Sequence, residues 1–149
     1  MYTFEIIVGT TLGSAEYVAD HLVEKLVEQG FKTNIHLDPK LTDLPINKNN
    51  PWIICTATHG AGDFPENILP FTQQLEQNSP DLSNVKYSVI ALGSKSYDQF
   101  CNAGHMIDRQ LAKLKAEKVA ITLEICTLET PIPEDMIDIW YPEWSQNWL

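Results

Sequence analysis

Short apolar runs constrain the fold of this chain more than any other feature. They lie at Phe4 to Val8, Trp52 to Ala57, Val89 to Leu92 and Val119 to Ile125, and they are rich in β-branched residues. Each run is too short for a helix that stands alone, and a continuous apolar run of this length is typical of a strand that is buried on both faces. We therefore expect a parallel sheet that helices cover on each side.

Helical patterns lie between these runs. From Ala15 to Leu26 the apolar residues share one face and acidic residues share the other, and Gly30 follows where a helix C-cap is expected. The remaining elements are expected to be a more polar strand at residues 32–37 and helices at 68–77, 103–115 and 134–149. The polar stretch 38–50 is expected to be a long connection with one helical turn at most.

The order of these elements predicts the architecture. Strands and helices alternate along the chain, and alternation at this spacing favours right-handed crossovers. The sequence therefore predicts an α/β fold with a doubly wound, five-stranded parallel sheet and helices on both faces. Its length fits one domain over residues 1–149.

Charge and cysteine content exclude several classes of function. Ten Lys and Arg against twenty Asp and Glu give a formal net charge of −10, which repels nucleic acid and anionic membrane surfaces. Cys55, Cys101 and Cys126 are odd in number and widely spaced, so they are interpreted as reduced thiols rather than a disulfide framework or a metal site. No secretion signal or membrane span is apparent. We expect a cytoplasmic monomer.

Candidate site residues follow the first, third and fourth predicted strands, because ligands of an open parallel sheet bind beyond the carboxyl ends of its strands. The first loop, Gly9 to Glu16, is rich in hydroxyl groups and runs directly into a helix, so its amides can converge on an anion. Neither GxxxxGK[ST] nor GxGxxG occurs there, which favours a monophosphate. A plain N-capping turn is the alternative interpretation.

The other two loops suit a flat ligand. Thr56 to Asn67 is glycine-rich, which permits close approach of the backbone. Leu92 to Asn102 places aromatic residues just past a strand, and the ring of Tyr97 could stack on a planar heteroaromatic group. His59 could either interact with the ligand edge or point into water, and Cys101 is interpreted as a small packing residue.

Three separated motifs agree in order and spacing with one protein family. GTTLGSAEYVA, TATHGAGDFPEN and LGSKSYDQFCNAG make the chain similar to the flavodoxins, in particular to the short MioC-type members and the FMN domains of diflavin reductases. This resemblance covers essentially the whole chain and implies strand order 2-1-3-4-5 and non-covalently bound FMN. The residues that it implies as FMN-binding are Thr10, Thr11, Leu12, Gly13, Ser14, Ala15, Thr58, His59, Gly60, Ala61, Gly62, Gly93, Ser94, Tyr97, Phe100 and Cys101.

The chain departs from the family pattern at three of these positions. Leu12 and Ala15 stand where many flavodoxins have hydroxyl residues, so more of the phosphate binding falls to backbone amides and FMN retention is expected to be weaker. His59 stands where diflavin relatives often place a Tyr against the flavin. Tyr97 is therefore the expected stacking residue.

The implied function is that of a low-potential electron carrier. Its expected partners are an NADPH-dependent flavodoxin reductase and acceptor redox enzymes with basic docking patches, because Asp63, Glu66 and Asp98 lie on the candidate loops. The alternative is a stand-alone NAD(P)H-dependent flavin or quinone reductase, for which three tight loops leave little chain to build a substrate pocket. A phospho-acceptor receiver is disfavoured, because threonines occupy the strand ends where receivers need clustered acids.

Overall fold

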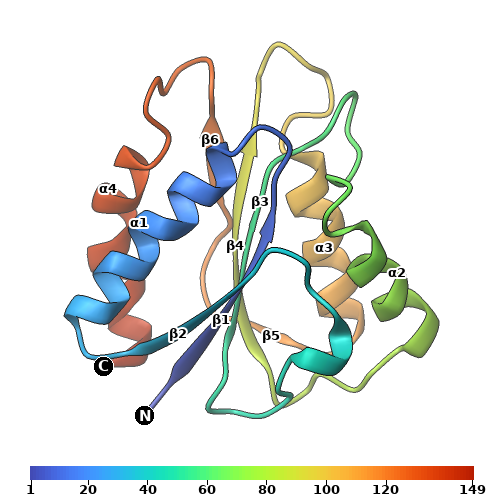
Figure 1. Cartoon of the computed structure of the whole chain (residues 1–149), viewed down its shortest axis with the longest axis vertical. Coiled ribbons are helices and arrows are strands. Elements are labelled where there is room, and N and C mark those ends of the chain that lie inside the picture. The colour runs from blue at the N-terminus through green and yellow to red at the C-terminus, as the bar shows by residue number, and fades with distance from the viewer.

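Every strand of the sheet runs parallel to its neighbours. The computed structural model describes residues 1–149 and orders the strands β2-β1-β3-β4-β5, with β6 also paired to β4. The strands are β1 (Thr3–Gly9), β2 (Lys32–His36), β3 (Trp52–Thr56), β4 (Lys86–Gly93), β5 (Glu117–Lys118) and β6 (Leu123–Cys126). The predicted parallel sheet with strand order 2-1-3-4-5 is confirmed (Figure 1).

The last predicted strand is divided into two short segments, so that the sheet has six strands rather than five. β5 pairs with the beginning of β4 and β6 pairs with its end. Between them Ile121 is 91% exposed, so this part of the apolar run faces solvent. Asp108 holds the region, because its carboxylate accepts hydrogen bonds from Lys118 Nζ at 2.6 Å and from the Tyr87 hydroxyl at 2.6 Å.

Helices cover both faces of the sheet. They are α1 (Ser14–Glu28), α2 (Leu69–Asn78), α3 (Asn102–Lys113) and α4 (Asp135–Trp144), with 3-10 turns η1 (Leu41–Asp43) and η2 (Ser145–Trp148). α1 and α4 lie on one face, and α2 and α3 lie on the other (Figure 1). The last helix, which was predicted to span residues 134–149, instead ends at Trp144, and the chain continues as η2. No helix combines the length and the apolar character needed to cross a membrane.

The end of α1 is as the sequence predicts. Gly30 has φ +88, a conformation that glycine adopts without steric cost. Its N–H bonds to the carbonyl of Val27, and the N–H of Phe31 bonds to that of Leu26. This pattern satisfies the last carbonyls of the helix and turns the chain into β2.

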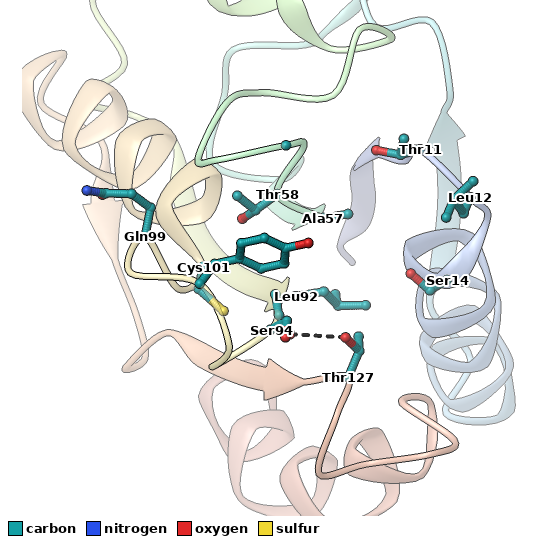
Figure 2. A pocket seen from close by; sticks show the side chains of 13 residues that line it. Thr11, Leu12, Ser14, Ala57, Thr58, Leu92, Ser94, Gln99, Cys101 and Thr127 are labelled. Atoms are coloured by element: carbon teal, nitrogen blue, oxygen red, sulfur yellow. Dashed lines mark hydrogen bonds between the residues drawn. The ribbon is translucent and has the colours of Figure 1, made fainter.

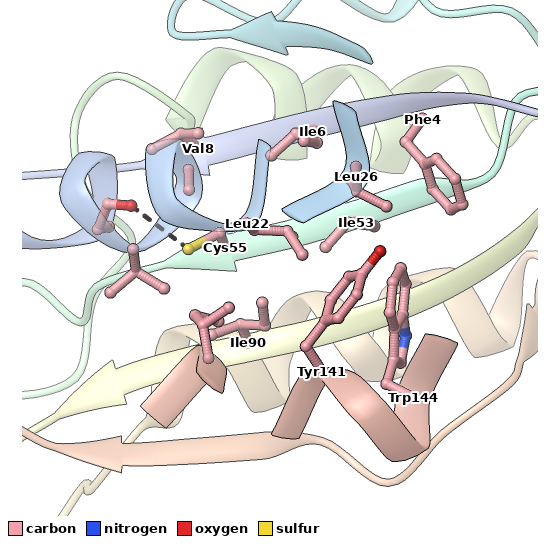
Figure 3. Close-up of a cluster of buried hydrophobic side chains, with 14 of the residues drawn as sticks. Phe4, Ile6, Val8, Leu22, Leu26, Ile53, Cys55, Ile90, Tyr141 and Trp144 are labelled. Carbon is pink, nitrogen blue, oxygen red and sulfur yellow. Dashed lines mark hydrogen bonds between the residues drawn. The ribbon is translucent and has the colours of Figure 1, made fainter. Parts of the chain in front are cut away.

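Each helix layer has its own hydrophobic core. Alternate residues of β1 point to opposite faces, so Phe4 and Ile6 contact the layer of α1 and α4 while Ile7 contacts the layer of α2 and α3. Figure 3 shows the first core, in which the rings of Tyr141 and Trp144 project from α4 toward the side chains of Ile53 and Phe4. Burial on both faces explains why β1, β3 and β4 are largely continuous apolar runs, whereas β2 and β5 are more exposed and more polar.

Candidate functional site

A pocket of about 270 Å³ lies at the carboxyl edge of the sheet, where β1, β3, β4 and β6 end (Figure 2). The strand order reverses there, between β1 and β3, which is where doubly wound sheets bind ligands. The wall is formed by Thr11, Leu12, Ser14, Ala57, Thr58, Gly60, Leu92, Gly93, Ser94, Tyr97, Gln99, Cys101 and Thr127.

The first loop forms the part of the pocket wall that adjoins the N-terminus of α1. Gly13 is the N-cap residue, with φ +92, and no side chain caps the helix. The N–H of Gly13 bonds to Thr10 Oγ1 at 3.0 Å, which closes the turn. The first amides of a helix have no partner within the helix, and its dipole favours negative charge at this end. The loop therefore suits a phosphate group.

Asn67, from the loop after β3, holds this turn in place. Its Oδ1 accepts the N–H of Thr10 at 2.9 Å, and its Nδ2 donates to the carbonyls of Val8 at 2.6 Å and Leu37 at 3.0 Å. One side chain thereby joins the ends of β1 and β2 to the second loop. Asn67 was not among the site residues predicted from the sequence, although its amide at the end of a glycine-rich loop was the available signal.

The second loop is a tight reverse turn between His59 and Asp63. These two residues exchange two backbone hydrogen bonds of 2.8 Å each. Gly62 has φ +139, and a Cβ there would lie 2.9 Å from the Cβ of Gln99. Asn102 Nδ2 also donates to the Gly62 carbonyl at 2.8 Å, so the second loop packs against the third. Glycine is required at this position because the two loops touch.

The third loop packs closely against the end of β4. A Cβ at Gly93 would lie 2.7 Å from the backbone nitrogen of Cys101, so only glycine fits beneath this loop. Tyr97 belongs to the pocket wall and is 59% exposed, which leaves its ring available to a planar ligand. Phe100 instead packs beside the core under α2 and α3, with Lys95 Nζ 5.8 Å from its ring centroid.

The pocket wall contains a large share of the predicted residues. Those that line it are Thr11, Leu12, Ser14, Thr58, Gly60, Gly93, Ser94, Tyr97 and Cys101, whereas Thr10, Gly13, Ala15, His59, Ala61, Gly62 and Phe100 lie outside it. Wall residues that were not predicted from the sequence are Ala57, Leu92, Gln99 and Thr127. Thr127 follows β6, and no local motif marks that strand end as part of the site.

The fold and the pocket together define a flavodoxin-like protein, and the sequence model of the family described as Flavodoxin matches residues 6–140. The chain belongs to the flavodoxin family, and FMN is the cofactor of that family. An uncapped helix N-terminus beside a pocket whose wall includes Gly60 and Gly93 fits a phosphate with a flat ring attached.

Particular relatives support this assignment. The chain is 43% identical to protein MioC of Escherichia coli K12 over 144 residues, 97% of each chain. It is 35% identical to flavodoxin YqcA of the same organism over 94% of each chain. The structure is similar to that of a cysteine-to-serine variant of a flavodoxin from Pseudomonas aeruginosa, with a TM-score of 0.87, 26% identity and 97% coverage of both chains. The resemblance to MioC-type flavodoxins is confirmed.

Proposed function

We propose that the protein is an electron carrier that binds FMN in the carboxyl-edge pocket and passes electrons from a reductase to acceptor enzymes. The observation that supports this proposal most is the exposure of the pocket wall. Leu12 is 95% exposed and Tyr97 is 59% exposed, so groups on the wall reach solvent directly. Such a site suits electron exchange with a docked partner more than capture of a substrate.

The residues around the pocket have separate roles in this proposal. The amides that begin α1, with the hydroxyls of Thr11 and Ser14, would hold the phosphate. The segment Thr58 to Gly62 would flank one side of the ring, and the loop from Gly93 to Cys101, with Tyr97 stacked, would flank the other. FMN, when bound, supplies the electron-transfer chemistry, while the chain orients it and sets its potential.

Thr10, Gly13 and Ala15 would act mainly by shaping the phosphate turn. Thr10 closes it through its hydroxyl, and Gly13 supplies the left-handed N-cap. Ala15, in the first turn of α1, is fully buried, so its contribution would come from its backbone amide. We propose that residues 1–149 act in this way as one FMN-binding domain, as a monomer in the cytoplasm.

Negative charge around the pocket supports a partner that has a basic docking surface. Asp63, Glu66 and Asp98 are exposed on the loops that follow β3 and β4, on a chain of net charge −10. These carboxylates would attract a basic patch and would disfavour extra negative charge on the reduced cofactor, which lowers its potential. An NADPH-dependent flavodoxin reductase with a basic docking face fits this surface.

Stopped-flow reduction by such a reductase across a salt series tests the proposal. We expect rates to fall as salt rises, because the Debye length is about 10 Å at 0.1 M. The double variant Asp98→Asn with Glu66→Gln should be slower at low salt and less sensitive to salt. The matched control, Glu76→Gln with Glu117→Gln, removes two exposed charges at the opposite edge and should behave as wild type. Equal salt dependence in all three proteins would refute docking through the pocket edge.

A further inference from the structure

Two cysteines that are far apart in the sequence lie beside each other next to the pocket. Cys101 is the N-cap residue of α3, Cys126 ends β6, and both are buried. Gly93 connects them: it is the strand partner of Cys126, and the position of a Cβ on Gly93 would be 3.3 Å from the Cα of Cys101. Cys126 lies beside Gly93 in the sheet, about 4.8 Å away, and Cys101 lies over Gly93. If these two directions are close to perpendicular, the cysteine Cα atoms are roughly 6 to 7 Å apart, at the upper end of the separations that a disulfide spans.

The thiol of Cys101 lies over the seam between β4 and β6. Its Sγ donates to the carbonyl of Ala91 at 3.3 Å. The carbonyls of Ala91 and Gly93 point to the same side of β4, because the residues are two positions apart. That side is the β6 side, since the Gly93 carbonyl accepts the N–H of Thr127 at 2.8 Å. The sulfur of Cys101 is therefore directed toward the strand that carries Cys126.

The electrostatics of Cys101 agree with this position. Burial raises the pKa of its thiol to about 12, and the charge of Glu124 on β6 also raises it. The backbone N–H of Ile125 lies close enough to the sulfur to oppose that rise in pKa. Cys101 thus interacts with the residues that immediately precede Cys126.

Cys126 is the more acidic of the two thiols. Its Sγ accepts the backbone N–H of Lys95 at 3.4 Å. Burial raises the pKa of Cys126, but the backbone N–H groups of Lys95, Glu129 and Leu128 outweigh burial, so that the pKa is lowered overall. A cysteine whose thiolate is stabilised in this way is the better nucleophile at neutral pH.

Cys55 has a different environment and cannot join this pair. It lies in the core under α1, on the other face of the sheet, where its Sγ donates to the Ala15 carbonyl at 3.4 Å (Figure 3). Burial raises the pKa of its thiol to about 12. Cys55 is thus an internal control for thiol chemistry in the same chain.

We propose that Cys101 and Cys126 form a reversible intramolecular disulfide when the protein meets hydrogen peroxide. The sulfur of Cys126 attacks one peroxide oxygen, the O–O bond breaks, and a sulfenic acid and one water form. The sulfur of Cys101 then attacks the sulfur of Cys126, the S–O bond breaks, and the thiol proton leaves with that oxygen as a second water. Two thiols are oxidised and one peroxide is reduced to two waters. The bond would join the start of α3 to the end of β6 in the pocket wall, where Cys101 and Thr127 lie.

Peptide mapping of the FMN-loaded, full-length protein tests this site. The protein is treated with hydrogen peroxide, alkylated, digested with trypsin without reductant and analysed by mass spectrometry. The three cysteines fall in three different tryptic peptides, because Lys86, Lys95, Arg109 and Lys118 separate them. We expect the peptides of Cys101 and Cys126 to be joined with loss of two hydrogens, a dithiol reductant to separate them, and the peptide of Cys55 to stay unlinked.

Variants make the assignment specific. Cys126→Ser and Cys101→Ser should each abolish the linked peptide, whereas the matched control Cys55→Ala should keep it. If one of the serine variants fails to fold, the wild-type map and the other variant still decide the question. The proposal is overturned if, after peroxide treatment of the wild type, both cysteines are still free thiols that the reagent alkylates, or if they are oxidised to sulfinic acid without a link. A link that joins two chains would overturn it as well. It is also overturned if a link persists in Cys126→Ser.

Discussion

Asn67 accepts the backbone N–H of Thr10 at 2.9 Å and thereby makes one structural unit of two loops that follow different strands. The same side chain donates to the carbonyl of Val8 at 2.6 Å, at the end of β1. The turn that begins α1 is therefore not held by its own residues alone. The geometry offered to a phosphate depends on a residue that does not line the pocket.

Replacing Asn67 tests this dependence. Asn67→Ala removes hydrogen bonds to partly buried backbone groups, so we expect a loss of about 1–3 kcal/mol in the free energy of unfolding and weaker FMN binding. Asn67→Asp keeps an acceptor for Thr10 but loses both donated bonds and adds a negative charge beside the phosphate turn, so its loss of FMN affinity should be at least as large. Urea unfolding and fluorescence titration measure the two effects. Reduced stability with unchanged FMN affinity would show that Asn67 does not position the phosphate turn.

Gly93→Ala should damage the third loop. The new Cβ would lie 2.7 Å from the Cys101 backbone nitrogen, and we expect this overpacking to cost about 1–3 kcal/mol and to weaken FMN binding. Gly30→Ala is the control, because its φ of +88 imposes backbone strain of about 1–2 kcal/mol far from the pocket. Both variants should lose stability in urea, but only Gly93→Ala should bind FMN less tightly. Equal FMN affinities in the two would contradict a role for the Gly93 contact.

Tyr97→Ala should act on the ring rather than on the phosphate. Loss of a stacked aromatic contact costs about 0.5–1.5 kcal/mol, so FMN and riboflavin should lose affinity by similar factors. Tyr97→Phe keeps the ring and should bind nearly as wild type. Unchanged affinity and an unchanged flavin absorption spectrum in Tyr97→Ala would place this side chain off the cofactor.

Stability should fall at alkaline pH. Burial raises the pKa of Cys55 from 9.0 to about 12, so above pH 9 the unfolded chain releases a proton that the folded protein keeps. The stabilisation is complete below pH 9 and is lost at roughly 1.4 kcal/mol for each pH unit as pH rises toward 12. Cys55→Ala should show a shallower decline in urea midpoint over this window. The same slope in variant and wild type would exclude Cys55 as the cause.

The central strands could be predicted because their local apolar sequence agrees with their burial on both faces in the fold. Ile6 and Ile54 lie in strands whose two faces are both buried, so their apolar runs identify them. The division of the last strand could not be predicted. Ile121 extends the apolar run but faces solvent, and the contacts of Asp108 that hold this region join residues distant in sequence.

The site could be predicted only where one loop carries the signal within itself. Glycines, hydroxyl groups and Tyr97 mark the three loops in the sequence, and most residues of the pocket wall could be predicted from them. Asn67, Thr127 and the pair of Cys101 with Cys126 depend on the register of strands that are distant in the chain. A single sequence does not contain that register, so these relationships emerged from the structure.

Comparison of FMN with riboflavin and FAD tests the central claim most directly. If the uncapped amides that begin α1 hold the phosphate, flavin fluorescence titration of the protein freed of cofactor should give one FMN per chain. Riboflavin lacks the phosphate and should bind more weakly by about tenfold or more, since hydrogen bonds to a charged group contribute about 1.5–3 kcal/mol. FAD should also bind much more weakly. Equal affinities for riboflavin and FMN would contradict the phosphate site and, with it, the assignment of the carboxyl-edge pocket to FMN.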